Sequence, residues 1–481
     1  MDTTERRTKA VALDLELAAV VAEGRAEHVN PVGGQGQDPA SWISSVDRAV
    51  RQCVGRLGEG RGRVAGIGVS GQSGGLVVLD ERNRILGPAC LPGERGLSED
   101  SEELSQAFGG PPGLIELTGN AMRTENTASF LYALKKRFPD RFAAVTTALL
   151  PHDFLNFWLT GEKRMEFGDA SSTGLMDVRT RSWSGEVLDF LDSRLRECLP
   201  PLCSSRGAQG LIRKELAQSW GLGGHVLVSA GGGRAMMEAI GAGNVVSGGV
   251  TVSLGRTGRL SGVSGEPLVD PRGMVSSFCD GTDQWMPMVM SAGATDPLEM
   301  VGKAFGWKSE DLEQAVAYAP GGAEGLMFLN QGSAGGVLHG IERSNYTPMN
   351  LARAAAEGVA MEFGHGLQRI MELGFRPEQV HVAGDWSRSR VWRQLVSDVL
   401  GLPVAAAKAG DGAALGAALQ SAITYFAESG ENLTYQEIAA YAAEPVEGTS
   451  CEPVKVEHER YRDLLSRRQF LSESLRGSGL N

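Results

Sequence analysis

The sequence lacks the features that mark several classes of protein. Its six cysteines include no C-x-x-C pair and its seven histidines show no ligand spacing, so neither a disulfide framework nor a zinc site is expected. No basic block occurs in this chain of formal net charge −12, so nothing in it attracts nucleic acid or an anionic membrane. No uncharged apolar run approaches a membrane span, and acidic residues interrupt the N-terminal apolar stretch, unlike a signal peptide. These absences predict a cytoplasmic protein that binds a small molecule, and they leave open whether that molecule is anionic and whether the protein is a homodimer.

Glycine, in contrast, is abundant: 65 of 481 residues, about twice the usual share. A hairpin pattern of strand, turn and strand occurs near residue 14 and again near residue 255, and helical patterns follow each occurrence. This repetition predicts an α/β protein with two similar halves around a central cleft. The predicted domains are 1–243 and 244–445, followed by a charged helical tail over 446–481.

The segment VLVSAGGGRAMMEAIGAG, residues 226–243, reads as a buried strand, a glycine turn and a helix, with Arg234 where the turn meets the helix. Such turns are where α/β proteins place groups that contact a ligand, because backbone and ligand can approach closely. An arginine there can hold an anion but cannot accept a proton at neutral pH. Arg234 therefore either clamps an anionic ligand or pairs with a neighbouring acid.

Several motifs resemble the FGGY carbohydrate kinases, most closely the xylulokinase branch. In chain order they are GIGVSGQSGGLVVLDERNRILGPA, LTGN, LLPHDFLNFWLTGE, GDASSTGLMDVRTRSWS, VSLGRTG, WRQLVSDVLGLPV and DGAALGAAL. The resemblance runs in order from about residue 9 to residue 425. It implies two ribonuclease-H-like domains of the actin and hexokinase superfamily, the first on the sugar side and the second on the nucleotide side, closing over a sugar and ATP with magnesium.

The resemblance also places departures at the positions where the family has its chemistry. Family kinases use an aspartate directly after the glycine run to take up the proton of the sugar hydroxyl, and this chain has Arg234 there. The motif DLEL is assigned to the first phosphate loop, where it keeps Asp14 but has Glu16 and Leu17 in place of glycine and threonine. A carboxylate at that position repels phosphate.

Further departures lie at the other ligand positions that the resemblance implies. The second phosphate loop has gained positive charge, and Trp386 stands where the adenine side has a small residue and fills space that the ring needs. Asp153 and Asp169 match the family pattern, although Asp153 precedes an apolar helical run and is also placed to cap it. The predicted ligand-binding residues are Ser70, Gln72, Arg95, Gly255, Arg256, Thr257, Arg259, Gly384, Asp385 and Trp386.

Three functions remain open. The preferred one is a pseudokinase or ligand-binding protein without a cofactor. The second is an enzyme repurposed for an anionic small molecule, with Arg234 as part of a clamp and Asp14 or Glu16 as acid or base. The third is an active sugar or polyol kinase using ATP and magnesium, with Glu238 as the relocated base and Asp14 as the magnesium ligand. Our hypothesis is that Arg234 pairs at least partly with Asp14 or Glu16, with the anion clamp as the alternative, and breaking a fully buried pair costs roughly 3 kcal/mol.

Overall fold

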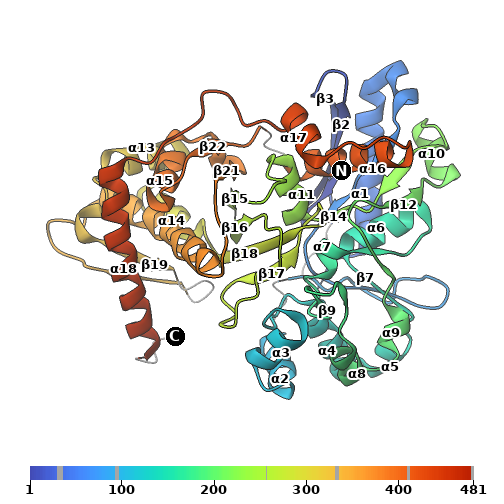
Figure 1. Cartoon of the computed structure of the whole chain (residues 1–481), viewed down its shortest axis with the longest axis horizontal. Helices are drawn as coiled ribbons and strands as arrows, with labels where there is room; N and C mark the ends of the chain where they lie inside the picture. Colours follow the sequence, from blue (N-terminus) through green and yellow to red (C-terminus); the bar gives the residue numbers. More distant parts are fainter. Residues whose placement is uncertain (30–35, 93–96, 256, 331–334, 409–411, 478–481) are drawn as a thin grey trace. The chain divides into compact units, whose positions relative to one another are not determined.

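The fold is given by a computed structural model, which describes residues 1–29, 36–92, 97–255, 257–330, 335–408 and 412–477 (Figure 1). The chain divides into two units. The first comprises Met1–Val246, Val263–Pro287 and Asp411–Glu444, and the second Ser247–Gly262, Met288–Gly410 and Pro445–Asn481. We predicted consecutive domains, whereas the chain crosses between the units repeatedly. The predicted tail belongs to the second unit.

The first unit is built on a five-stranded sheet of order β14-β5-β1-β2-β3. Its strands are β1 (Asp2–Thr3), β2 (Arg7–Asp14), β3 (Ala19–Glu27), β5 (Ser70–Gly71) and β14 (Gly232–Gly233). β1, β5 and β14 are parallel to one another, whereas β2 is antiparallel to both β1 and β3. The carboxyl ends of three parallel strands therefore meet at one edge of this sheet, where α/β folds place their ligands.

Helices and several short strands complete the first unit. The helices are α1 (Pro39–Leu57), α2 (Leu97–Ala107), α3 (Pro111–Thr118), α4 (Thr127–Arg137), α5 (Pro139–Ala143), α6 (Pro151–Thr160), α7 (Phe167–Ala170), α8 (Gly185–Leu191), α9 (Leu195–Cys198), α10 (Lys214–Trp220), α11 (Arg234–Gly241), α16 (Gly412–Glu428) and α17 (Tyr435–Ala442). The other strands are β4 (Gly66–Ile67), β6 (Val77–Leu79), β7 (Thr147–Leu149), β8 (Met165–Glu166), β9 (Met176–Asp177), β10 (Ser182–Trp183), β11 (Leu202–Cys203), β12 (Ala208–Leu211), β13 (Leu227–Ser229) and β17 (Ser276–Cys279).

Helix α16 returns to the first unit because it packs on α11 backbone to backbone. A Cβ added at Gly416 would lie 1.8 Å from the carbonyl oxygen of Met237, and one at Gly241 would lie 1.8 Å from that of Gly412. Gly68, just before β5, approaches the carbonyl of Ala417 equally closely. Only glycine permits such approach, so these three glycines bring α16 against the elements around the glycine turn.

The second unit has a sheet in which the strands β18-β16-β15-β21-β22 are neighbours in that order. The strands of this sheet are β15 (Gly249–Ser253), β16 (Thr257–Gly262), β18 (Trp285–Ala292), β21 (Gln379–Ala383) and β22 (Val404–Ala406). The strands β19 (Met327–Asn330) and β20 (Gly336–His339) form a separate antiparallel pair. Its helices are α12 (Asp296–Phe305), α13 (Ser309–Tyr318), α14 (Pro348–Glu372), α15 (Arg390–Leu400) and α18 (Lys455–Gly477). Figure 1 shows α18 beside α14 and α15. Across the described residues, no helix combines the length and the apolar character that crossing a membrane requires.

Candidate functional site

Arg234 lies at the edge of the first sheet where the three parallel strands end. The register places Ser70 of β5 beside both Asp2 of β1 and Gly232 of β14, and Arg234 begins α11 directly after β14. Ser70 Oγ donates to Asp2 Oδ1 at 2.8 Å, and Arg234 Nε lies 3.7 Å from Asp2 Oδ2. The Asp2 side chain is 11% exposed and that of Arg234 is 41% exposed. The acid that pairs with Arg234 is therefore Asp2, which the sequence analysis did not single out.

The prediction that Arg234 pairs with Asp14 or Glu16 is wrong. Lys9 is the residue opposite Asp2, so Asp14 lies five residues farther along β2, about 17 Å toward the opposite edge of the sheet. There Asp14 Oδ1 accepts hydrogen bonds from the N–H groups of Glu16 (2.9 Å) and Leu17 (3.2 Å). Glu16 forms an ion pair with Arg63 at 3.1 Å. The two turns of the β1-β2-β3 meander lie at opposite ends of the strands. The motif DLEL forms the β2-β3 turn, at the end far from Arg234.

The turn between β1 and β2 is the one that follows Asp2, and it is closed on itself. The N–H of Thr4 donates to the carbonyl of Arg7 at 2.9 Å. The Thr4 hydroxyl accepts from the N–H groups of Arg6 (3.4 Å) and Arg7 (3.2 Å). Glu5, exposed at the tip, adds a negative charge. A turn that cradles phosphate needs free N–H groups, and those of Thr4, Arg6 and Arg7 are engaged within the turn.

The glycine turn before Arg234 is held from two sides by buried amides. Gln420 of α16 accepts from the N–H of Gly231 and donates to its carbonyl, each at 2.8 Å. Asn156 of α6 donates to the carbonyl of Ala230 at 2.7 Å. Gly231 has a φ of +71°, a conformation that glycine adopts at least cost. The place of Arg234 is thus set by helices far apart in the sequence.

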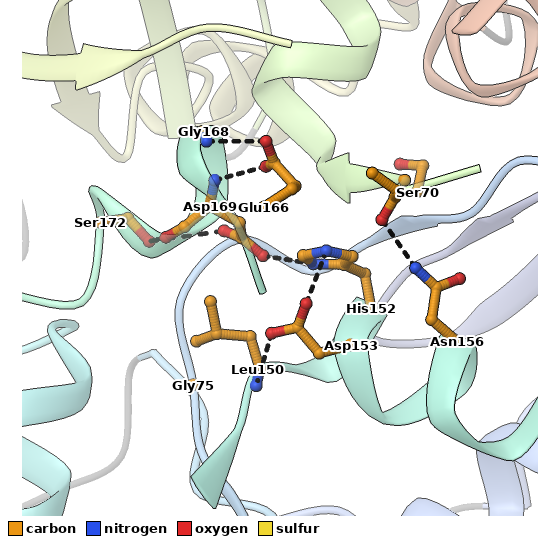
Figure 2. Close-up of polar contacts among 12 residues, drawn as sticks. Ser70, Gly75, Leu150, His152, Asp153, Asn156, Glu166, Gly168, Asp169 and Ser172 are labelled. Atoms are coloured by element: carbon orange, nitrogen blue, oxygen red, sulfur yellow. Dashed lines mark hydrogen bonds and ion pairs between the residues drawn. The ribbon is translucent and has the colours of Figure 1, made fainter. Parts of the chain in front are cut away.

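A buried cluster of ionisable groups lies against this turn (Figure 2). His152 Nδ1 is 2.7 Å from Asp169 Oδ2, and His152 Nε2 is 2.9 Å from Asp153 Oδ1. All three side chains are at most 1% exposed. Burial alone lowers the pKa of His152, but the two carboxylates outweigh it and hold that pKa well above its ordinary value. Burial also raises the pKa of Asp153, which His152 partly offsets.

Glu166 extends the cluster. Its carboxylate accepts from the N–H groups of Gly168 (2.7 Å) and Asp169 (2.5 Å) and from the hydroxyl of Ser205 (2.6 Å), so it caps helix α7. Burial raises the pKa of Glu166 to about 7 despite these bonds.

Asp153 accepts a hydrogen bond from the N–H of Leu150 at 3.2 Å. The predicted capping role of Asp153 is confirmed, and its contact with His152 is an addition that the sequence did not indicate.

Two further predicted residues have structural partners in the first unit. The Gln72 side-chain amide donates to Gln37 Oε1 at 3.3 Å and the residue is 8% exposed. Glu238 is 6% exposed and faces α16, where a Cβ added at Gly412 would lie 3.7 Å from its Cγ. A general base must reach the proton that it removes, and burial against α16 does not favour Glu238 in that role.

The remaining predicted residues belong to the second unit or lie outside the described residues. Pairing of Ser253 with Ala383 places the β15-β16 turn, with Gly255 and Thr257, at the same sheet edge as Gly384. Arg259 follows on β16, opposite Ser253 and Met290. Arg95 and Arg256 lie outside the described residues, as does the side chain of Asp385.

Trp386 packs into a hollow of the second unit. Its ring lies 6.2 Å from that of Trp392 in an edge-to-face arrangement. The hollow is lined by Leu298, Leu312, Glu313, Val316, Ala356, Trp386, Ser389, Val391 and Trp392. Its free volume is about 10 Å³, room for one water molecule. Trp386 is therefore packed among side chains of the second unit, and its role on the adenine side stays a prediction.

The two units have the α/β fold of the actin and hexokinase superfamily, as predicted. Residues 1–241 match the N-terminal domain of the FGGY family of carbohydrate kinases, and residues 307–425 match its C-terminal domain. The chain belongs to this family.

Among its relatives is the xylulose kinase of Haemophilus influenzae, which is 34% identical over 439 residues, covering 88% of this chain and 89% of the relative. The xylulose kinase of Escherichia coli is 32% identical over 397 residues, covering 79% and 80%. A crystal structure described as a xyloylose kinase from Brucella ovis superimposes with a TM-score of 0.90 at 27% identity, covering 99% of this chain and 98% of that one.

The family implies ATP and magnesium, and the donor set around Asp2 does not fit magnesium. Magnesium requires several oxygen ligands in a nearly octahedral arrangement. One oxygen of Asp2 accepts from Ser70 and the other faces the guanidinium of Arg234. Asp14, the predicted ligand, uses Oδ1 to accept a hydrogen bond from the N–H of Glu16 in its own turn. In the described part of the chain, no group of three or more His, Cys, Asp or Glu side chains is placed to hold a metal ion.

Replacing Arg234 is expected to cost little stability. Since the side chain is 41% exposed and its contact with Asp2 is 3.7 Å, Arg234→Ala should lower the free energy of unfolding by less than about 1 kcal/mol. This replaces the larger value expected for a fully buried pair. Chemical denaturation followed by circular dichroism measures it, with Arg343→Met, an exposed arginine of the second unit, as control. A loss of several kcal/mol would contradict the exposed position.

Proposed function

We propose that this FGGY-family protein binds a small ligand without transferring phosphate by the family's aspartate-base route. The main support for this proposal is the contact between Arg234 and Asp2. The family resemblance implies a carboxylate at the position of Arg234. An arginine, in contrast, cannot take up the proton of a hydroxyl. The self-closed turn after Asp2 and the burial of Glu238 support the same conclusion.

The second candidate is an active sugar kinase with another base, which the similarity to xylulose kinases favours. A third, an enzyme acting on an anionic small molecule, draws support from the exposure of Arg234, whose guanidinium is open enough to contact a ligand. These candidates differ in what they require. The kinase needs ATP turnover, the repurposed enzyme needs turnover of an anionic substrate without ATP, and the ligand-binding protein needs neither.

The test is ATP-dependent phosphorylation of xylulose and of a panel of pentoses and polyols. We expect no product above background, because loss of the base alone removes roughly a factor of 10² to 10⁴ in rate. The xylulose kinase of Haemophilus influenzae serves as positive control. Arg234→Asp is expected not to restore activity, because the new carboxylate faces Asp2 and the turn after Asp2 stays closed. Robust phosphorylation by the unmodified protein would reject the proposal.

Binding of magnesium-ATP is expected to be weak, with a Kd above about 1 mM. Trp386 and its neighbours leave room for only one water in their hollow, and the N–H groups of the turn after Asp2 are engaged. Isothermal titration calorimetry measures the affinity. Trp386→Ala, which enlarges the hollow, tests the steric part, with Trp307→Ala as a matched control. A micromolar Kd for the unmodified protein would contradict this expectation and favour the kinase.

A further inference from the structure

The cluster of ionisable side chains beside the glycine turn has no role in the function proposed above. It brings three carboxylates, those of Asp153, Asp169 and Glu166, around the single imidazole of His152, all at most 1% exposed. A buried charge is stable only when it is paired. One imidazolium can balance one carboxylate, so the cluster as a whole is short of positive charge, and burial raises the pKa of the Asp153 and Glu166 carboxyls.

The cluster lies close to the backbone of the turn, where Met237 and Ser73 are its other side-chain neighbours. A Cβ added at Gly233 would lie 2.7 Å from Asp169 Oδ1, and one at Gly232 would lie 3.2 Å from Glu166 Oε1. One added at Gly71 of the neighbouring strand would lie 2.7 Å from Cβ of His152. Figure 2 shows the imidazole between its two carboxylates, with Glu166 beyond Asp169. Gly233 directly precedes Arg234, so a change of charge in the cluster acts on the backbone that carries this arginine.

We propose that His152, Asp153, Asp169 and Glu166 position the glycine turn that carries Arg234, and that they do so only while the cluster retains its protons. When the protons leave, net negative charge develops beneath the turn. That charge draws the guanidinium of Arg234 away from Asp2 and loosens residues 231–233. The proposal concerns the protein without ligand, so it is independent of the function proposed above.

Other ionisable groups around the cluster are mostly acidic and do not replace the missing positive charge. They are Cys203 of β11, Cys279 of β17, Arg206, Asp280, Asp283 and Tyr435 of α17, with Arg164 beside Cys203 and Arg181 beside Cys279. Asp280 binds its own turn through the N–H groups of Thr282 and Gln284. Asp283 accepts from Ser205 N–H and from the Ser204 hydroxyl. Arg206 stacks on the ring of Tyr435 at 5.5 Å.

The contribution of the cluster to the stability of the folded protein depends on pH with a definite sign. Burial raises the pKa of Glu166 from 4.5 to about 7, so between these values the folded protein holds a proton that the unfolded chain lacks. The pKa of His152 is also raised, because its carboxylates outweigh the effect of burial. Both contributions to stability are present at low pH and are lost as the pH rises, through about 7 for Glu166 and through a higher value for His152.

The test follows Arg234 in protein labelled with [15Nε]arginine, its Nε–Hε resonance assigned by loss in Arg234→Lys. Between about pH 5.5 and about pH 8.5 we expect this resonance to shift with a midpoint near neutrality, and hydrogen-exchange protection of residues 226–240 to fall at least about tenfold beyond the intrinsic change. Glu166→Gln should move or remove the midpoint. The matched substitutions Glu186→Gln and His225→Gln, at exposed positions, should leave it unchanged.

A resonance that stays constant over this range in the unmodified protein overturns the proposal, and that measurement does not depend on any variant folding. The same midpoint in Glu166→Gln as in the unmodified protein also overturns it. Where Glu166→Gln fails to fold, Asp153→Asn serves as the second variant, with the same two outcomes.

Discussion

Gly416→Ala is expected to destabilise the first unit by about 3 kcal/mol or more. The added methyl would lie 1.8 Å from the carbonyl oxygen of Met237 and 2.9 Å from the N–H nitrogen of Gly241. Both are backbone atoms of α11, which cannot rotate away as a side chain would. The helices must therefore separate, which loosens α16 and with it the hold of Gln420 on Gly231.

Denaturant unfolding followed by circular dichroism measures this cost. Gly55→Ala is the matched control, because it makes the same change within α1 where nothing lies within 4 Å of the new methyl. Alanine is a better helix former than glycine, so the control should gain roughly 0.5 to 1 kcal/mol. Equal unfolding midpoints for the two variants would show that α11 and α16 do not pack as closely as described.

Arg353→Met is expected to destabilise the second unit by about 3 to 5 kcal/mol. Arg353 Nε lies 2.6 Å from Glu357 Oε1, and the same oxygen accepts from the hydroxyl of Tyr461 at 2.7 Å and from the N–H of Gly322 at 2.8 Å. Glu357 is 2% exposed and Tyr461 is fully buried. Removing the arginine leaves the carboxylate in the interior without a cation, where its charge is costly.

The double variant Arg353→Met/Glu357→Leu separates the loss of a pair from the exposure of an unpaired charge. Replacing a buried ion pair by apolar side chains of similar volume is often close to neutral. The double variant should therefore recover most of the stability lost in Arg353→Met, while the exposed substitution Arg343→Met should change it by less than about 0.5 kcal/mol. A double variant as unstable as the single one would indicate that the loss comes from packing and not from charge.

This ion pair also bears on how the C-terminal segment is understood. The charge pattern of 446–481 predicted a helical tail, and α18 does form from Lys455 to Gly477. Charge alone did not indicate that Tyr461 is buried against Glu357 or that Arg468 pairs with Glu362 of α14 at 3.1 Å. One hydrogen bond and one ion pair to α14 make α18 part of the second unit, and a helical charge pattern does not distinguish such partners from exposed charges.

The sequence by itself determined the family, the α/β class and the place of Arg234, because each depends on local order along the chain. Motifs in family order identify the fold, and a strand, a glycine run and a helix place the arginine at the start of α11 whatever surrounds it. The sequence also predicted the cap at Asp153, since an N-terminal cap contacts only its own first turn.

Only the tertiary structure decided which acid meets Arg234. Asp14 ends an eight-residue strand with a clear pattern, whereas Asp2 lies in a two-residue strand that has no periodicity to detect. The register of β1 with β5 and of β5 with β14 brings Asp2 to Arg234, and the antiparallel course of β2 carries Asp14 to the far edge. The buried cluster around His152 and the return of α16 likewise depend on contacts between residues far apart in the sequence. Their physical cause is packing in three dimensions, which local patterns do not contain.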